Sequence, residues 1–317
     1  MIDRLKNVIF DTSMGPDCDD AGALAVLNKL CDFGEAKALA MGNCTVFPEG
    51  ACCIDAMNWY YGRHSIPVGT LKAAGGQGPG KDTGEDWLKY NKYIAENFEH
   101  SFKHTLIPDV VTVYREALAK AENDSVILIT IGFFTNIKNL MQSGPDMYSN
   151  LTGEELVNQK VKKLVSMAGN FRSGHSDFFS EFNVNTDIEA ARYVVEHLRK
   201  DIVFCPFEMG YPILTGSRLI SMGDMKKNPV AKAYQLWCGQ SGSRHSWDLV
   251  TVYYAVRGHH GLFKESKKGS ITIDENGFTY FKENPHGKHM IIMNRLPPNE
   301  IAQIIEDIIN LTPELVR

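Results

Sequence analysis

The stretch "IFDTSMGPDCDDAGALAVL", residues 9–27, joins a short apolar run to a helical pattern and places Asp11, Asp17, Asp19 and Asp20 between them. An aspartate at a helix start caps free backbone N–H groups and suits the helix dipole, which accounts for one or two of the four. Carboxylates this close repel one another unless a cation neutralises them or they share protons. The stretch therefore predicts a metal site where a strand passes into a helix.

The alternation of strand and helix continues along the chain. Strand-like runs at 36–42, 66–70, 125–132, 162–169 and 201–207 alternate with helical patterns at 19–34, 50–63, 109–123, 135–143 and 187–199. This pattern is typical of an α/β fold with an open, mostly parallel sheet and helices on both faces. A C-terminal β-hairpin at 269–284 and an amphipathic helix at 299–311 follow. We expect a single domain over residues 1–317, with a long surface loop at 72–104.

Composition describes an ordinary globular protein, with 44% hydrophobic and 22% charged residues and a net charge of -5. The sequence has no stripe of basic residues that would indicate nucleic acid or an anionic membrane as a partner. It also has no apolar run long enough to span a bilayer. Seven scattered cysteines without a CxxC pair predict reduced thiols. The N-terminus has no signal-peptide core, so we expect a cytoplasmic protein; a periplasmic or secreted one would require a leader removed beforehand.

Polar segments follow several predicted strands at their carboxyl ends, where open α/β sheets bind ligands. Residues 11–20 follow the first strand, 42–43 the second, 132–136 the strand at 125–131, and 167–183 the next one. We expect these segments to converge on one cleft although they span much of the chain.

These segments resemble, in order, the motifs of the inosine-uridine nucleoside hydrolases. "VIFDTSMGPDCDDAGAL" is similar to the family's Asp-x-Asp-Pro-Gly-x-Asp-Asp-Ala, "AMGNCTV" to its Gly-Asn segment and "ITIGFFTNIKNL" to its Gly-x-x-Thr-Asn-Ile stretch. "MAGN" with "SEFNVNTDIEAA" resembles its Met-Gly-Gly and Glu-Phe-Asn stretch, and "SWDLVTVYYAV" its late His-Asp-Pro segment. The five matches cover residues 7–256.

The resemblance implies a Rossmann-like nucleoside hydrolase fold and a calcium-dependent N-glycosidase that cleaves a ribonucleoside into ribose and a free base, in purine or pyrimidine salvage. It also implies a homo-oligomer, either a dimer or a tetramer. Calcium prefers several oxygen ligands, and the positions that match the family's metal site are Asp20 and Asp248, the supporting Asp11 and Asp19, and the carbonyl of Ile131. The positions that match its sugar and base site are Asn43, Met167, Glu181, Asn183 and Trp247. Taken alone, Glu181-Phe-Asn183 also reads as a helix-capping turn, and Met167 as core.

The first departure from the family concerns the general base. Ser13 stands where the family has its second aspartate, and a hydroxyl cannot accept a proton near neutral pH without a base beside it. Three residues separate Gly15 from Asp19 where the family has one, and this insertion brings Asp17. We expect Asp17 to supply the missing carboxylate. The alternative is a solvated Asp17 in a catalytically weakened relative that binds a nucleoside or sugar.

The second departure concerns the leaving group. Trp247 occupies the position of a family histidine, and an indole can stack on a base but cannot protonate it. His175 and His245 are candidate acids, although an ordinary surface histidine is the more common explanation for each. A rival enzyme class, the haloacid-dehalogenase-like phosphatases, requires an Asp-x-Asp pair that Ser13 also interrupts.

Overall fold

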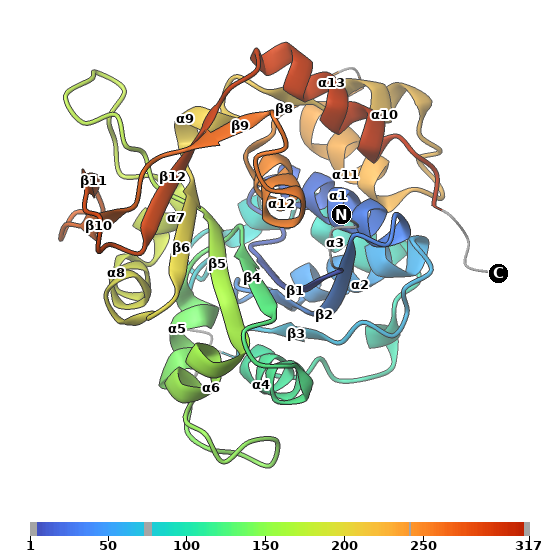
Figure 1. The fold of residues 1–317 in the computed structure, drawn as a ribbon. Coiled ribbons are helices and arrows are strands. Elements are labelled where there is room, and N and C mark those ends of the chain that lie inside the picture. Colours follow the sequence, from blue (N-terminus) through green and yellow to red (C-terminus); the bar gives the residue numbers. More distant parts are fainter. Residues whose placement is uncertain (1–4, 73–77, 241, 314–317) are drawn as a thin grey trace.

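A large mixed sheet crosses the centre of the molecule (Figure 1). This computed structural model describes residues 5–72, 78–240 and 242–313. Across the sheet the order is β11 (Thr279–Glu283), β10 (Gly269–Ile273), β12 (His289–Asn294), β6 (Asp201–Cys205), β5 (Val161–Met167), β4 (Val126–Thr130), β1 (Lys6–Thr12), β2 (Ala36–Asn43) and β3 (Val68–Thr70), with β9 (Phe263–Glu265) paired to β12. The strands from β3 to β12 are parallel, whereas β9, β10 and β11 run antiparallel to their partners. The open, mostly parallel sheet is thus confirmed.

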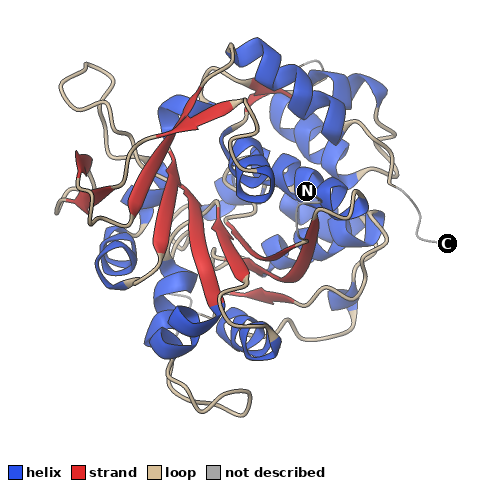
Figure 2. Ribbon diagram, viewed as in Figure 1, coloured by secondary structure: helices blue, strands red, loops and turns tan. Residues whose placement is uncertain are grey.

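Helices cover both faces of the sheet (Figure 2). One face packs against α1 (Asp19–Asp32), α2 (Pro48–Tyr60) and α12 (Trp247–Arg257). Three more helices lie outside these, on and around α1: α10 (Ser217–Met222), α11 (Pro229–Cys238) and α13 (Pro298–Ile309). The other face packs against α4 (Val110–Lys120), α5 (Thr135–Gln142), α6 (Gly153–Lys160) and α8 (Ile188–His197). The short helices α7 (Phe182–Thr186) and α9 (Phe207–Gly210) and the ladder of β7 (Leu214–Thr215) with β8 (Arg244–His245) lie near the strand ends. Within the described ranges, no helix is both long and apolar enough to cross a membrane.

The strand β1 shows how the sequence directs side chains to the two faces. Val8 and Phe10 join the core under α1 and α12, whereas Ile9 joins the core under α4 and α5. Successive strand residues point to opposite faces, and this alternation continues into the polar end of β1. Asp11 therefore contacts α4 and Thr12 contacts α1.

The segment 72–104 is more ordered than the expected surface loop. It contains the helix α3 (Asn91–Asn97) and the 3₁₀ turns η2 (Gly84–Leu88) and η3 (Ser101–Lys103); residues 73–77 lie outside the described part. The Tyr90 hydroxyl donates to the Asp17 carbonyl at 2.6 Å, and the Asn91 amide donates to the Met14 carbonyl at 3.1 Å. The loop prediction was wrong because a helix of seven residues is too short to show a clear period. This segment anchors the inserted loop between β1 and α1.

Candidate active site

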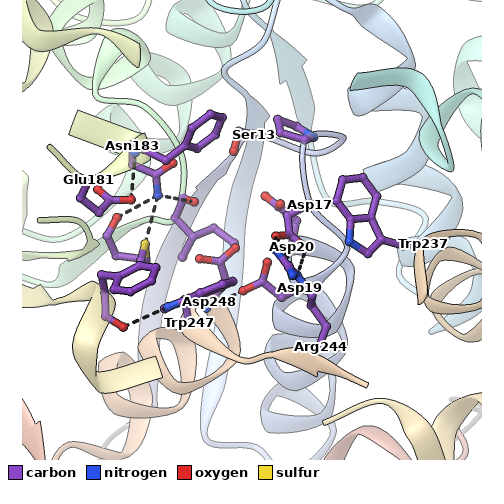
Figure 3. Close-up of a pocket in the computed structure, with 15 residues that line it drawn as sticks. Ser13, Asp17, Asp19, Asp20, Glu181, Asn183, Trp237, Arg244, Trp247 and Asp248 are labelled. Atoms are coloured by element: carbon purple, nitrogen blue, oxygen red, sulfur yellow. Dashed lines mark hydrogen bonds and ion pairs between the residues drawn. The ribbon is translucent and has the colours of Figure 1, made fainter. Parts of the chain in front are cut away.

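Most of the residues singled out from the sequence surround one cavity of about 320 Å³ at the carboxyl ends of β1, β4 and β5 (Figure 3). The loop between β1 and α1, the ends of β4 and β5, and the starts of α1, α7, α9 and α12 supply most of its wall. Parallel sheets bind ligands at this edge. Segments from both ends of the chain therefore meet at the expected cleft.

Three buried aspartates lie together on one side of the cavity, and we call this group the acidic floor. Asp19 and Asp20 open α1, Asp248 opens α12, and one carboxylate oxygen from each lies within 4.8 Å of the other two. The backbone N–H of Asp248 donates to Asp19 at 3.1 Å. Thr12 donates its hydroxyl proton to Asp20. Two helix N-termini thus face the same point, and both favour negative charge there.

The electrostatics of this cluster suit a cation. Burial raises the pKa of all three carboxyl groups, that of Asp20 to about 8, and repulsion between the carboxylates adds to the rise at Asp19 and Asp248. The charged form is stabilised when a cation lies among the oxygens. The three carboxylates offer only oxygen donors, which suits a hard divalent cation, and Ile131 lines the cavity beside them. The residues present therefore fit a metal of this kind.

Asp11 lies apart from the three-aspartate cluster. Its carboxylate accepts hydrogen bonds from Tyr114 at 2.6 Å, Asn136 at 2.7 Å and Thr130 at 3.2 Å, and burial raises its pKa to about 7. The alternation of β1 turns this side chain toward α4 and α5, away from α1. Asp11 therefore holds the end of β1 in place, and the structure does not bring it among the cavity residues.

The opposite wall carries the Glu-Phe-Asn segment. Glu181 caps α7 by accepting the N–H groups of Asn183 at 2.9 Å and Val184 at 3.3 Å, and it also accepts the Gly169 N–H at 3.0 Å. The capping interpretation is therefore confirmed, and the capping residue also lines the cavity, while its role in sugar binding stays a prediction.

Asn183 lies beside Glu181 on this wall. It donates from Nδ2 to the carbonyls of Met167 at 3.0 Å and Ile131 at 3.2 Å. Its Oδ1 accepts no hydrogen bond from the described residues, so this oxygen remains available to a ligand hydroxyl. Met167 lies at the end of β5 and forms part of the cavity wall.

Aromatic rings form the rim of the cavity. Trp247 stacks near Phe207, with ring centroids 5.3 Å apart, and donates its indole N–H to the Phe207 carbonyl at 3.0 Å. Phe182 and Trp237 also line the space. Flat apolar faces above an acidic floor suit a ligand with one polar ring and one aromatic ring.

Asp17 reaches the cavity, as expected, but it is not free. Its two oxygens accept from Arg244, with Nε at 2.9 Å from Oδ1 and 3.0 Å from Oδ2. Oδ1 also accepts the N–H of Cys18 at 2.6 Å. Ser13 lies on the same wall, and a Cβ at Gly132 would come within 2.6 Å of the Ser13 backbone nitrogen. Glycine at 132 therefore allows the strand ends to approach.

Besides Asp11, three predicted residues lie outside the cavity lining. His175 is exposed in the loop between β5 and α7. His245, on β8, stacks on Tyr211 with centroids 4.4 Å apart. Asn43 is buried and donates to the carbonyls of Thr45 at 3.1 Å and of Phe47 at 2.9 Å, so it shapes the loop after β2. The structure thus gives neither histidine a place beside a bound base.

The sequence motifs did not indicate several cavity residues, notably Phe182, Phe207, Trp237 and Arg244. Phe182 lies inside the Glu-Phe-Asn segment and Phe207 ends a predicted strand, so position alone could have indicated both. Arg244 had no local signal, because its partner Asp17 lies 227 positions away in the sequence. Trp237 belongs to α11, and nothing in its local pattern indicates the site.

The fold and the cavity define an open-sheet α/β protein with an oxygen-rich acidic site and an aromatic rim for a small ligand. The sequence model of the inosine-uridine preferring nucleoside hydrolases matches residues 8–301, and the chain belongs to that family. It is therefore a member of the hydrolases that act on N-glycosyl compounds, and family and fold together support hydrolysis of ribonucleosides.

Solved structures with the same fold are distant in sequence. The inosine-uridine preferring nucleoside hydrolase from Bacillus anthracis is 17% identical with a TM-score of 0.71, covering 98% of this chain and 100% of that one. The purine-preferring ribonucleoside hydrolase from Gardnerella vaginalis is 15% identical with a TM-score of 0.69, covering 97% and 99%. The type III effector XopQ, solved with adenosine diphosphate ribose, is 12% identical with a TM-score of 0.74, covering 98% and 95%. Among curated proteins, none matches the chain.

Proposed function

We propose that this protein hydrolyses the N-glycosidic bond of a ribonucleoside or similar N-riboside, releasing ribose and the free base. One observation carries the proposal: a buried acidic cluster and a Glu-Asn wall face each other across a cavity with an aromatic rim. The acidic side suits a cation and sugar hydroxyls, and the rim suits a flat base. The site lies within one domain in this proposal.

Calcium is the cation we propose, held by Asp19, Asp20 and Asp248 with the Ile131 carbonyl as a further oxygen donor. When bound, a divalent cation would orient the sugar hydroxyls and a water molecule and make that water more acidic. The support is the donor set itself, because oxygens of three buried carboxylates converge within 4.8 Å of one another.

The chain's own residues then position the ribose. Asn183 presents Oδ1 to a sugar hydroxyl, and Met167 supports the ring from the strand end. Cleavage of an N-riboside passes through an oxocarbenium-like transition state, so the carboxylates beneath the ring stabilise its positive charge. Trp247 and Phe207, which contact each other, provide an aromatic surface against which the base lies.

A carboxylate of the acidic cluster accepts a proton from the attacking water in this proposal. That Asp17 is this acceptor stays a prediction, since Arg244 engages both of its oxygens. His175 and His245 stay candidate acids only if loops move toward the cavity. The homo-oligomer and the cytoplasmic location likewise stay predictions.

A second candidate function has its own observation. Ser13 lacks a carboxylate and Asp17 is paired, so a relative that binds an N-riboside without turnover is the alternative. The structure of XopQ with adenosine diphosphate ribose shows a protein of this fold holding a ribosylated ligand. A protein that binds calcium and ribose but releases no ribose from a nucleoside would be this binding relative and not a hydrolase.

The test is release of free ribose from a set of common ribonucleosides by metal-stripped protein, with and without added calcium. We expect release that requires calcium and saturates with it. Matched samples with nucleoside binding measured by calorimetry separate the two candidates. Calcium-dependent binding with no ribose from any nucleoside would overturn the hydrolase and support the binding protein.

A further inference from the structure

Arg244 is the one cationic side chain among the described residues that line the cavity, where it faces five carboxylates. It comes from β8, and its guanidinium carbon lies 5.2 Å from the centre of the Trp247 ring. No described histidine lines the space. The rim that suits a base therefore has one permanent positive charge at its edge.

Asp17 fixes the orientation of this guanidinium. Nε donates to both oxygens of Asp17 at 2.9 and 3.0 Å, and Nη2 donates to Oδ2 at 2.5 Å. The third nitrogen, Nη1, has no hydrogen bond to another residue of the described ranges. Arg244 therefore keeps both N–H groups of Nη1 and the second N–H of Nη2 for a ligand, while Asp17 holds the edge formed by Nε and Nη2.

We propose that Arg244 stabilises the departing base, with Asp17 as its positioning residue, so that the site prefers ribosides whose base leaves as an anion. This inference rests on the proposed hydrolase function. The acidic floor would otherwise oppose negative charge that develops on the base. Donors aimed at developing charge in a water-poor site are among the strongest contributions to catalysis.

The step balances without a protein acid. The bond between C1′ and the base nitrogen breaks, and its electron pair leaves on the base as an anion that Arg244 stabilises. A water oxygen bonds to C1′, and one water proton passes to a carboxylate of the cluster. The base anion takes a proton from solvent after it leaves. Neither Trp247, whose indole N–H is bonded to Phe207, nor a histidine is needed.

Three substrates test the inference in the full-length protein with calcium: inosine, p-nitrophenyl β-D-riboside and nicotinamide riboside. The hypoxanthine of inosine is a poor leaving group that departs as an anion. The p-nitrophenolate departs without help, and nicotinamide departs as a neutral molecule. The variants are Arg244→Gln, and Arg244→Lys, which keeps the charge but loses the planar fork.

The chain offers a matched control in Arg257, on the opposite end of α12. Its Nε and Nη2 pair with Glu35 at 2.7 Å each, and it lies over the ring of Tyr253, but it does not line this cavity. Arg257→Gln removes the same kind of ion pair from the same structure. It should leave kcat on all three substrates within about 2-fold of the wild type, in the range of a surface substitution.

We expect Arg244→Gln to lower kcat on inosine by about 10²- to 10³-fold, as loss of a transition-state donor does. Its kcat on p-nitrophenyl riboside should fall less than about 3-fold, and on nicotinamide riboside it should stay or rise. Arg244→Lys should lie between the wild type and Arg244→Gln on inosine. An equal loss on all three substrates would overturn this inference and leave the hydrolase intact. No turnover of any substrate by the wild type would overturn the proposed function and this inference with it.

Discussion

Asn183 joins the ends of two strands to the sugar side of the cavity. Its amide nitrogen bonds to the Met167 and Ile131 carbonyls, so its side chain cannot rotate without losing both contacts. These two bonds fix the orientation of the amide group of a residue that lines the cavity. A residue held in this way contributes to binding through its position as much as through its hydrogen bond.

Asn183→Ala should lower kcat/KM for a ribonucleoside by an amount that corresponds to about 1–3 kcal/mol of transition-state stabilisation, because it removes a hydrogen bond to a buried sugar hydroxyl. Steady-state kinetics would measure this loss. Asn185→Ala on the same short helix is the control, since Asn185 is exposed. Full activity in Asn183→Ala would show that the match to the family's Glu-Phe-Asn segment is accidental.

Substitution of Asp17 distinguishes two roles of this residue, as a positioning residue for Arg244 and as the general base. As a positioning residue for Arg244, Asp17→Asn should slow inosine by about 10-fold, the size expected for loss of one ion-pair partner, and spare p-nitrophenyl riboside. As the general base, it should slow both by about 10²- to 10⁴-fold. Ser13→Asp in the Asp17→Asn background is the companion. Recovery there would favour the base role, because the family carboxylate would then replace Asp17.

At the level of single residues, the sequence identified those whose neighbours repeat a recognisable motif. Asp19, Asp20, Glu181 and Asn183 were predicted because each lies in a short ordered segment, and all four line the cavity. Arg244 was not predictable in this way. Its importance depends on a contact with Asp17 across 227 positions, and no local pattern records such a pairing.

At the scale of secondary structure, the helices α1 and α12 place the aspartates of the acidic site. α1 and α12 pack against each other and begin at the same place, so the first turn of each presents aspartates to the other (Figure 1). Burial opposes ionisation at these positions, while the helix N-termini favour it. Where burial dominates, as at Asp20, the metal-free protein holds a proton that the unfolded chain releases.

The metal-free protein should therefore become less stable as pH rises. Burial raises the pKa of Asp11 to about 7 and that of Asp20 to about 8, against 3.8 for the ordinary group. Between pH 4 and 8 the folded chain binds more protons than the unfolded chain, so the free energy of unfolding falls with pH. The loss should be on the order of a few kcal/mol.

Thermal unfolding in EDTA at pH 5.5, 6.5, 7.5 and 8.5 checks this slope. Added calcium should reverse it at the higher pH values, because the ion binds the deprotonated carboxylates. Asp20→Asn should flatten the metal-free slope. A midpoint that rises with pH in EDTA would contradict the raised pKa values of Asp11 and Asp20.

Elements were predictable where the hydrophobic period was long and failed where it was short. α1, α8 and the buried strands β1, β4, β5 and β6 match the expected positions to within a few residues. The helix α3 escaped prediction because its seven residues lie in a Gly- and Lys-rich segment. The direction of Asp11 was predictable in principle, since β-strand alternation alone sends it to the face opposite α1.

At the scale of the molecule, the parallel sheet brings remote segments together. Asp20 lies near the N-terminus and Asp248 lies 228 positions later, yet one oxygen of each belongs to the same cluster. The order of strands explains this meeting, because β1 lies between β4 and β2, while α12 packs against α1 and across β4, β5 and β6. The resemblance predicted which residues would meet, and the fold supplies the reason.

Calcium binding measured by titration calorimetry tests the central claim most directly, namely that these chain segments build one metal site. The wild type should bind one calcium ion per chain, and Asp248→Asn should weaken that binding by about 100-fold or more, because it removes one of few charged ligands. Asp307→Asn, at an exposed carboxylate on α13, should bind as the wild type does. No calcium binding by the wild type at millimolar concentration, or equal binding by Asp248→Asn, would contradict the account.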